Sequence, residues 1–142
     1  VKAARRHLGR RGTLASHVAQ PALAELIAEG AYATHIRRTR RIYARRMAAL
    51  IDSAEHLSGI ATLSPTVAGM HIVADLDPAL SRRMSDRQAA ERLMSDGIMA
   101  APLSDYYAGP ALRQGLLLGF AGFEEEPIRA AVRRMSRALA RR

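Results

Sequence analysis

Histidine, serine and aspartate side chains are the first places to look for metal binding or nucleophilic chemistry in this sequence. Cysteine is absent, and the chain contains five histidines: His7, His17, His35, His56 and His71. No two of them stand at the spacing of a metal-ligand pair, so the sequence predicts no metal site. No serine lies in a nucleophile-elbow pattern, and a Ser-His-Asp triad therefore lacks support. We predict no catalytic residue, and we interpret His71, within an apolar segment, as a satisfied core side chain.

Glycines and tyrosines near the end of the chain are weaker candidates for a binding site. Gly115, Gly119 and Gly122 lack the spacing of a dinucleotide-binding loop and are typical of strand ends and close packing. Tyr106 and Tyr107 follow a Pro-Leu-Ser-Asp turn in a chain with only 4% aromatic residues. Adjacent tyrosines on a loop either line a pocket or pack the loop, and the sequence leaves both interpretations open.

Basic side chains are concentrated in the first part of the chain. Residues 1–46 hold 11 basic and 2 acidic side chains, whereas residues 47–123 hold 5 basic and 8 acidic ones. Such a patch either attracts phosphate or nucleic acid or forms a solvated helix face, and we favour the solvated face. Residues 22–46 also fit a helix–turn–helix with Gly30 at the turn. The length of its second helix and the scarcity of Asn and Gln near its start argue against that hypothesis.

Hydrophobic spacing predicts two helices in this first part. Residues 20–29 form a short amphipathic helix, with Pro21 tolerated in the first turn and Gly30 suited to a left-handed C-cap. A second helix is expected from Ala31 to about Leu57, ended by Gly59. Arg46 lies next to the apolar side and should pair with a carboxylate or extend along the surface. The apolar stripe of this helix consists of Ile36, Tyr43, Met47, Leu50, Ala54 and Leu57.

The second part of the chain alternates short apolar segments with helices. Strands are expected at 60–64, 69–74, 98–101 and 116–120, the third of them stopped by Pro102. Asp75, Asp77 and Pro78 open a loop, and Ser85 with Gln88 forms a capping box for a helix that ends near Ser95. Three glutamates begin the final helix, where negative charge suits the helix dipole. The core face of that helix is Ile128, Ala131, Val132, Met135 and Leu139.

This order predicts an α+β fold in which a long helix precedes a small two-layer domain with a short, mainly antiparallel sheet and helices on one side. No apolar run is long enough to span a membrane. The opening VKAARRHLGRRG lacks the apolar stretch of a secretory signal. Because the sequence also begins without methionine, we expect it to be part of a longer protein. Because it contains no cysteine, we expect that protein to be cytoplasmic.

Four segments in order resemble the end of MocR-type regulators of the GntR superfamily. They are QPALAELIAEGAYATHIRRTRRIYARRMAAL (20–50), AGMHIVADL (68–76), SDRQAAERLMSDGIMAAPLSDYY (85–107) and GLLLGFAGFEEEPIRAAVRRM (115–135). Such regulators join a winged helix–turn–helix to an aminotransferase-like domain of fold type I. The resemblance covers nearly the whole chain, and HIRRTRRIYARR, APLSDYY and LLLGFAGF are its most specific parts.

The resemblance implies that residues 1–57 are the end of a large domain and a connector helix, and that residues 58–142 are the small domain. In such proteins the lysine that binds pyridoxal phosphate lies on the large domain. Lys2 is the only lysine here, and its context does not look like the Ser-Lys element. We therefore expect the cofactor in the intact protein, with no cofactor-binding residue in this chain.

The resemblance also suggests residues of an effector pocket. Transaminase relatives usually carry a carboxylate-binding arginine where Leu117 stands here, and leucine cannot make that contact. Either another residue makes it, with Arg113 as the candidate, or the ligand has no α-carboxylate. Tyr106 and Tyr107 are expected near the mouth of this pocket.

Our main hypothesis is a non-catalytic, effector-sensing region of a bacterial transcription regulator. Its implied partners are an amine or amino-acid effector, a second copy of the protein, and DNA bound through a domain outside these residues. The alternatives are part of a genuine pyridoxal-phosphate-dependent aminotransferase and a small arginine-rich DNA-binding domain.

Overall fold

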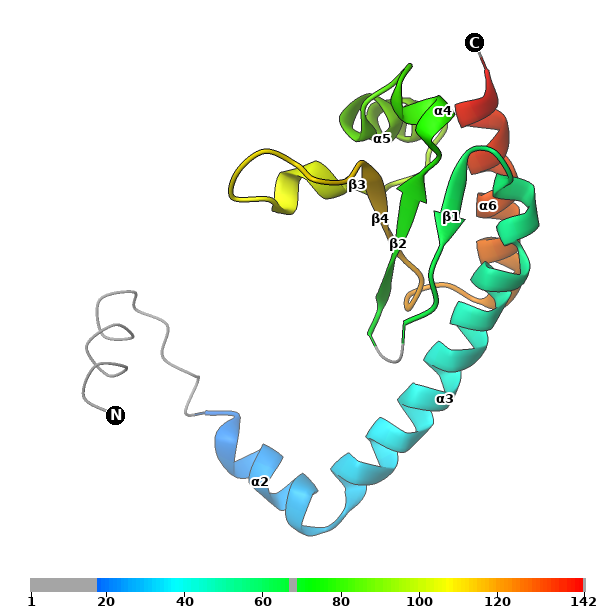
Figure 1. Ribbon diagram of the computed structural model, residues 1–142. Helices are drawn as coiled ribbons and strands as arrows, with labels where there is room; N and C mark the ends of the chain where they lie inside the picture. The colour runs from blue at the N-terminus through cyan, green and yellow to red at the C-terminus, as the bar shows by residue number, and fades with distance from the viewer. Residues whose placement is uncertain (1–17, 67–68, 142) are drawn as a thin grey trace. The chain divides into compact units, whose positions relative to one another are not determined.

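The computed structural model describes residues 18–66 and 69–141 (Figure 1). Its contacts divide the chain into two units between residues 39 and 40. The interpretation of Lys2 and the expected absence of a secretory signal concern residues outside the described part. The domain boundary expected at residue 57 stays a prediction.

The first unit contains helix α2 (Gln20–Ala28) and the start of helix α3 (Ala31–Asp52). Pro21 stands in the first turn of α2, as expected. Gly30 separates the two helices with a φ of 76°, a left-handed conformation that glycine adopts without steric cost. The predicted glycine C-cap is therefore confirmed.

Helix α3 ends earlier than its hydrophobic pattern predicted. It stops at Asp52, and a separate 3₁₀ helix, η1, covers Ala54–Leu57. The hydroxyl of Ser53 donates to the carbonyl oxygen of Ala49 at 2.7 Å, a local bond that competes with regular helical hydrogen bonding. Leu57 is nevertheless fully buried, so the apolar stripe reaches the core although the helix does not continue.

The second unit is built on a four-stranded antiparallel sheet with the order β1-β2-β4-β3. The strands are β1 (Ala61–Leu63), β2 (His71–Leu76), β3 (Ala101–Pro102) and β4 (Gly115–Gly119). The prediction of a strand at 98–101 is wrong for residues 98–100, since only Ala101 of that range lies in β3. The backbone N–H of Ile98 instead donates to Leu93 at 2.8 Å and closes the helix before it, with Gly97 at a φ of 71°.

Two short helices connect β2 to β3. Helix α4 (Pro78–Ser81) occupies the stretch expected to be a loop, because the Asp77 carboxylate caps it through the N–H of Ala79 at 2.8 Å. Helix α5 (Asp86–Ser95) begins with the predicted capping box between Ser85 and Gln88. The other 3₁₀ helix, η2 (Leu103–Tyr106), lies between β3 and β4.

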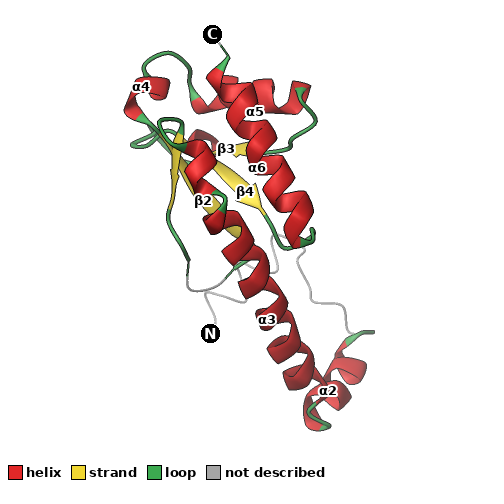
Figure 2. Cartoon of the chain, turned by 90° about the vertical axis from the view of Figure 1, so that its right-hand side faces the viewer, coloured by secondary structure: helices red, strands yellow, loops and turns green. Residues whose placement is uncertain are grey.

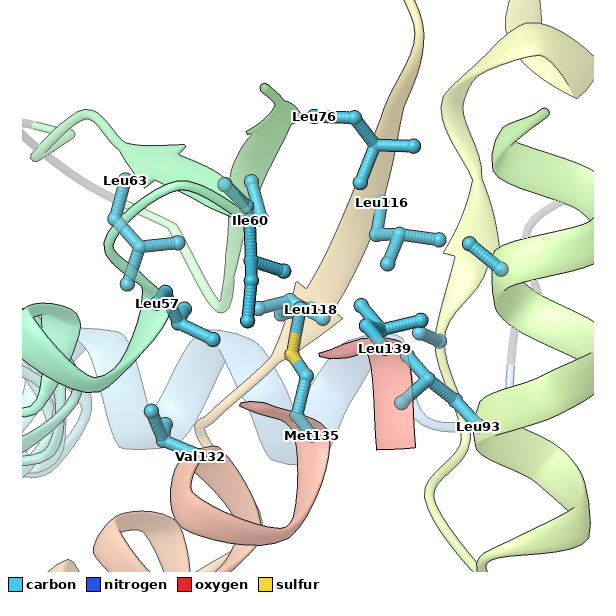
Figure 3. Packing of buried hydrophobic residues seen from close by; sticks show 14 of the residues in the cluster. Leu57, Ile60, Leu63, Leu76, Leu93, Leu116, Leu118, Val132, Met135 and Leu139 are labelled. Atoms are coloured by element: carbon cyan, nitrogen blue, oxygen red, sulfur yellow. The ribbon is translucent and has the colours of Figure 1, made fainter. Parts of the chain in front are cut away.

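Helix α6 (Glu125–Ala140) packs against one face of the sheet, together with α5 and η1 (Figure 2). Its predicted core face is largely confirmed: Ile128, Val132, Met135 and Leu139 are buried, and Ala131 is half-buried. Figure 3 shows side chains from α6, η1, α5 and the strands meeting in one apolar cluster. The predicted α+β architecture, with helices on one side of the sheet, is present.

Arginines at the end of α3 join it to the start of α6. Arg46 pairs with Glu124 and donates to the carbonyl oxygen of Ala121, and its side chain is only 14% exposed. Arg45 pairs with Glu125 at 3.2 Å but is 67% exposed. The Glu125 backbone N–H, followed by Arg45, lowers the pKa of the Glu125 carboxyl. The expected pairing of Arg46 with a carboxylate is confirmed.

These neighbouring arginines should differ in their effect on stability. Replacing Arg46 with alanine removes nearly buried charged hydrogen bonds, and we expect a loss of about 2 kcal/mol in the free energy of unfolding. Arg45→Ala is the matched control, and its exposed pair should contribute less than about 1 kcal/mol. Urea unfolding of both variants measures the difference. Equal losses would show that the burial of Arg46 gives it no special part in joining the helices.

Candidate functional site

The face of the sheet opposite the helices carries the candidate site. Along β4, Leu116 and Leu118 are buried on the helix side, so Leu117 and Gly119 point to the other side. Directly opposite residues on paired strands share a face, and Leu117 pairs with Val73 and with Ala101, while Gly119 pairs with His71. The open face therefore presents a row of small and apolar groups with one imidazole at its end.

A cavity of about 590 Å³ is lined partly by this face of β4 and partly by α6 residues such as Ile128, Ala131 and Met135. It extends past the end of β3 toward α6, so both sides of β4 contribute to its wall. Its size falls within the range of small-molecule sites. Its lining is mainly apolar, it includes His71 and Arg134 as basic groups, and it has no carboxylate. Among its other lining residues are Met99, Ala101, Tyr106, Leu117, Gly119 and Phe123.

Two of the four predicted pocket residues line this cavity. Leu117 forms part of the wall from the middle of β4, and Tyr106 contributes from the end of η2. Met99 and Phe123 border the same cavity and are 81% and 58% exposed. Large apolar side chains left this exposed around a cavity are typical of surfaces that are covered when a ligand or another part of the protein is present.

The other two predicted residues lie elsewhere. Arg113 binds the carboxylate of Asp75, with its Nε 2.9 Å from Oδ1 and its Nη2 2.7 Å from Oδ2. These hydrogen bonds and the charge of Asp75, with a smaller effect from Tyr107, raise the pKa of Arg113. Neither Arg113 nor Tyr107 is among the residues that line the cavity. The Nε–Nη2 edge of Arg113 is therefore taken by Asp75, away from the cavity lining.

His71 was interpreted wrongly from the sequence. It is exposed at the first position of β2, and it lines the cavity rather than the core. The strand alternates, and Ile72, Ala74 and Leu76 take the buried positions. The sequence held the necessary signal, because a strand that buries Ile72 must turn His71 to the other face.

Asp86 fixes the loop that carries Tyr106, and it was not recognised from the sequence. Its side chain is only 1% exposed, yet it accepts hydrogen bonds from the Ser104 hydroxyl at 2.7 Å and the Ser104 N–H at 2.9 Å. It also accepts from the N–H of Gly115 at 3.3 Å, at the start of β4. Because one buried carboxylate joins α5, η2 and the start of β4, the position of the loop that carries Tyr106 depends on it.

Other parts of the described structure are weaker candidates for a functional site. A shallower depression of about 520 Å³ is bordered by Arg87 and Asp105, which pair with each other at 2.7 Å. Within residues 18–66 and 69–141, no group of three or more His, Cys, Asp or Glu side chains is placed to hold a metal ion. No helix in the same ranges is both long and apolar enough to cross a membrane.

Comparison with known proteins finds regulators by sequence. The chain is 33% identical over 129 residues to the probable rhizopine catabolism regulatory protein MocR of Rhizobium meliloti, which covers 90% of this chain and 25% of that protein. It is 28% identical over 122 residues to the pyridoxine biosynthesis regulator PdxR of Corynebacterium glutamicum, covering 86% of this chain and 25% of that protein. No protein-family model matches. The chain thus spans about a quarter of the curated relatives it matches.

Comparison of structures finds aminotransferases. The α-aminoadipate aminotransferase LysN of Thermus thermophilus aligns with a TM-score of 0.70 and 24% identity over 82% of this chain and 29% of LysN. An aspartate transaminase of Corynebacterium glutamicum aligns with a TM-score of 0.69 and 22% identity over 94% of this chain and 32% of that enzyme. The resemblance to MocR-type regulators in sequence and to aminotransferases in fold is therefore confirmed.

The hydrogen bonds of Asp86 predict how strongly this wall depends on it. Asp86→Ala should lower the free energy of unfolding by about 3 kcal/mol, because buried donors of Ser104 and Gly115 lose their acceptor. Asp86→Asn keeps one acceptor oxygen and should fall between the original chain and the alanine variant. Hydrogen exchange should quicken at the amides of Ser104 and Gly115.

Asp105→Ala is the control for that experiment, because Asp105 lies on the same loop but is 51% exposed in its pair with Arg87. Its loss should stay below about 1 kcal/mol. If Asp86→Ala is as mild as Asp105→Ala, the loop is held by other contacts.

Proposed function

We propose that this chain, similar to MocR-type regulators in sequence and to aminotransferases in fold, is one wall of the effector-sensing region of a bacterial transcription regulator. The observation that carries the proposal is the combination of the two likenesses. The sequence relative MocR and the structural neighbour LysN each match more than four fifths of the same chain. The cavity between β4 and α6, which reaches the open sheet face, supplies a place for the effector.

The residues present do not fit a covalently bound pyridoxal phosphate. The solved relatives include LysN with N-(5'-phosphopyridoxyl)-L-leucine and a kynurenine aminotransferase of Pyrococcus horikoshii with PMP. In this chain the ranges 18–66 and 69–141 contain no lysine, and Lys2 lies outside them. We propose that the imine-forming lysine and the phosphate-binding groups belong to the rest of the intact protein, and we assign no chemical step to this chain.

In the intact protein, the effector would lie between this chain and the part that carries the cofactor. Residues 58–142 would move as a small domain relative to the part before residue 57, and that movement would shift the DNA-binding module between states. The relative YhdI of Bacillus subtilis is an HTH-type transcriptional regulator, which supports DNA as the partner and a cytoplasmic location for the intact protein.

The enzyme alternative has less support from the site. Leu117 offers no charge in the cavity, and Arg113 is occupied by Asp75. The helix–turn–helix alternative fits the arrangement of α2 and α3 around Gly30, but the alignment of 94% of the chain with an aspartate transaminase accounts for much of the same region. A winged helix encoded upstream of Val1 would support the regulator over the enzyme, and a salt-dependent titration with duplex DNA tests the helix–turn–helix alternative.

Reaction with pyridoxal phosphate tests the non-catalytic assignment. The chain is incubated with the cofactor, reduced with borohydride, and examined by mass spectrometry. We expect only weak, non-saturating adducts, and Lys2→Arg should leave their amount nearly unchanged because the amino terminus also reacts. A saturable one-to-one adduct that Lys2→Arg abolishes would contradict the proposal.

Self-association is also proposed. Leu23 and Ile27, one helical turn apart on α2, are 45% and 56% exposed, and Leu26 beside them is 47% exposed. We expect light scattering to show a mass that rises with concentration, because association removes this apolar surface from water. Leu23→Gln with Ile27→Gln should reduce the rise, and Leu112→Gln, at an 85% exposed loop position, is the control. A constant monomer mass at all concentrations would overturn this proposal.

A further inference from the structure

His71 stands where the cavity can recognise an acid group. Its ring lies over Gly119 of β4: a Cβ built on that glycine would be 3.4 Å from His71 Cδ2 and 3.6 Å from Nε2. The imidazole therefore lies directly above β4 at Gly119, at van der Waals distance from where a Cβ would stand. Among the residues that the structure describes, none forms a hydrogen bond with the ring of His71, so its donor is free for a ligand.

The electrostatic character of the cavity favours an anion over a cation. Its charged or titratable basic groups are His71 and Arg134, and no carboxylate lines it. Arg134 already donates to the carbonyl oxygen of Asp96. Arg134 keeps further N–H groups, but His71 is the basic group that stands beside Gly119 and forms no hydrogen bond with the described residues. Both the neutral and the protonated imidazole carry at least one N–H.

The apolar part of the cavity lies next to this donor. Leu117 is two residues from Gly119 on the same side of β4, roughly 7 Å along the strand. Met99 and Phe123 also border the cavity and are exposed. A ligand that places an acid group on His71 can therefore lay an apolar group against these side chains.

We propose that His71 binds the carboxylate of the effector and that the adjoining wall binds an apolar group of the same molecule. This proposal rests on the proposed function, because it names the chemical class of ligand for the same cavity. The specificity then comes from β2, through His71, rather than from Leu117 of β4. The ligand class is a small carboxylic acid with an apolar side group.

The test uses two probes of similar shape, 3-phenylpropionate and the uncharged 3-phenylpropanol, titrated into the 142-residue chain by NMR. We expect 3-phenylpropionate to shift the imidazole C–H signals of His71 saturably. His56, an exposed histidine on η1 outside the cavity lining, is the internal control and should not shift. His71→Phe should weaken binding of the acid about tenfold while leaving 3-phenylpropanol nearly unchanged, because the charged hydrogen bond is lost and the apolar contact is kept.

His71→Gln provides rescue, because its amide restores a donor at the same position, and it should bind the acid within about threefold of the original chain. Unchanged amide spectra outside the cavity confirm that each variant is folded. If His71→Phe binds the acid as well as the original chain does, the role of His71 is overturned while the pocket survives. If neither probe shifts any cavity residue, the pocket itself is overturned together with the proposed function.

Discussion

The sheet is buried on one face only, and the other features of the molecule depend on this constraint. The antiparallel register between β2 and β4 places Ile72 and Ala74 opposite Leu118 and Leu116, and all four are buried under the helices. Alternation then turns His71, Val73, Leu117 and Gly119 outward together. A shift of one residue between the strands would exchange the two sets and expose the core. The candidate site is thus specified by the same pattern that specifies the core.

Polar contacts fix the position of η2, which the pairing of the strands does not determine. The strands set the positions of His71 and Leu117, but Tyr106 lies on η2, which has little buried apolar surface of its own. The buried carboxylate of Asp86 compensates by holding Ser104 to α5 and to the start of β4. Gly115 leaves room for η2 beside β4, since a Cβ there would lie 3.2 Å from Leu103 Cδ2. On the open face, the strands therefore set the positions of His71 and Leu117, whereas the position of Tyr106 depends on the carboxylate of Asp86.

Features with local causes were predictable from the sequence. The capping box at Ser85, the left-handed Gly30 and the core face of α6 each depend on residues within a few positions of one another, and the structure contains all three. Features with distant causes were not. The acceptors and donors around Asp86 come from residues 18 and 29 positions away, so neither its burial nor its role could be inferred from spacing. The strand predicted at 98–101 was only partly correct. The backbone N–H of Ile98 donates to Leu93 at the end of α5, so Ile98 does not belong to β3.

The distribution of charge bears on the proposed sensing role. Most arginines of the second unit that meet a carboxylate do so away from the cavity: Arg113 with Asp75, Arg46 with Glu124, and Arg129 with Asp52 at 3.4 Å. The cavity lining contains neither a lysine nor a carboxylate, and its imidazole is the group to which we assign ligand binding. It does provide shape, apolar surface and an imidazole donor, which are enough to discriminate between ligands. A wall with these properties can change position when a ligand binds without changing the ligand, and this is the property that a sensor requires.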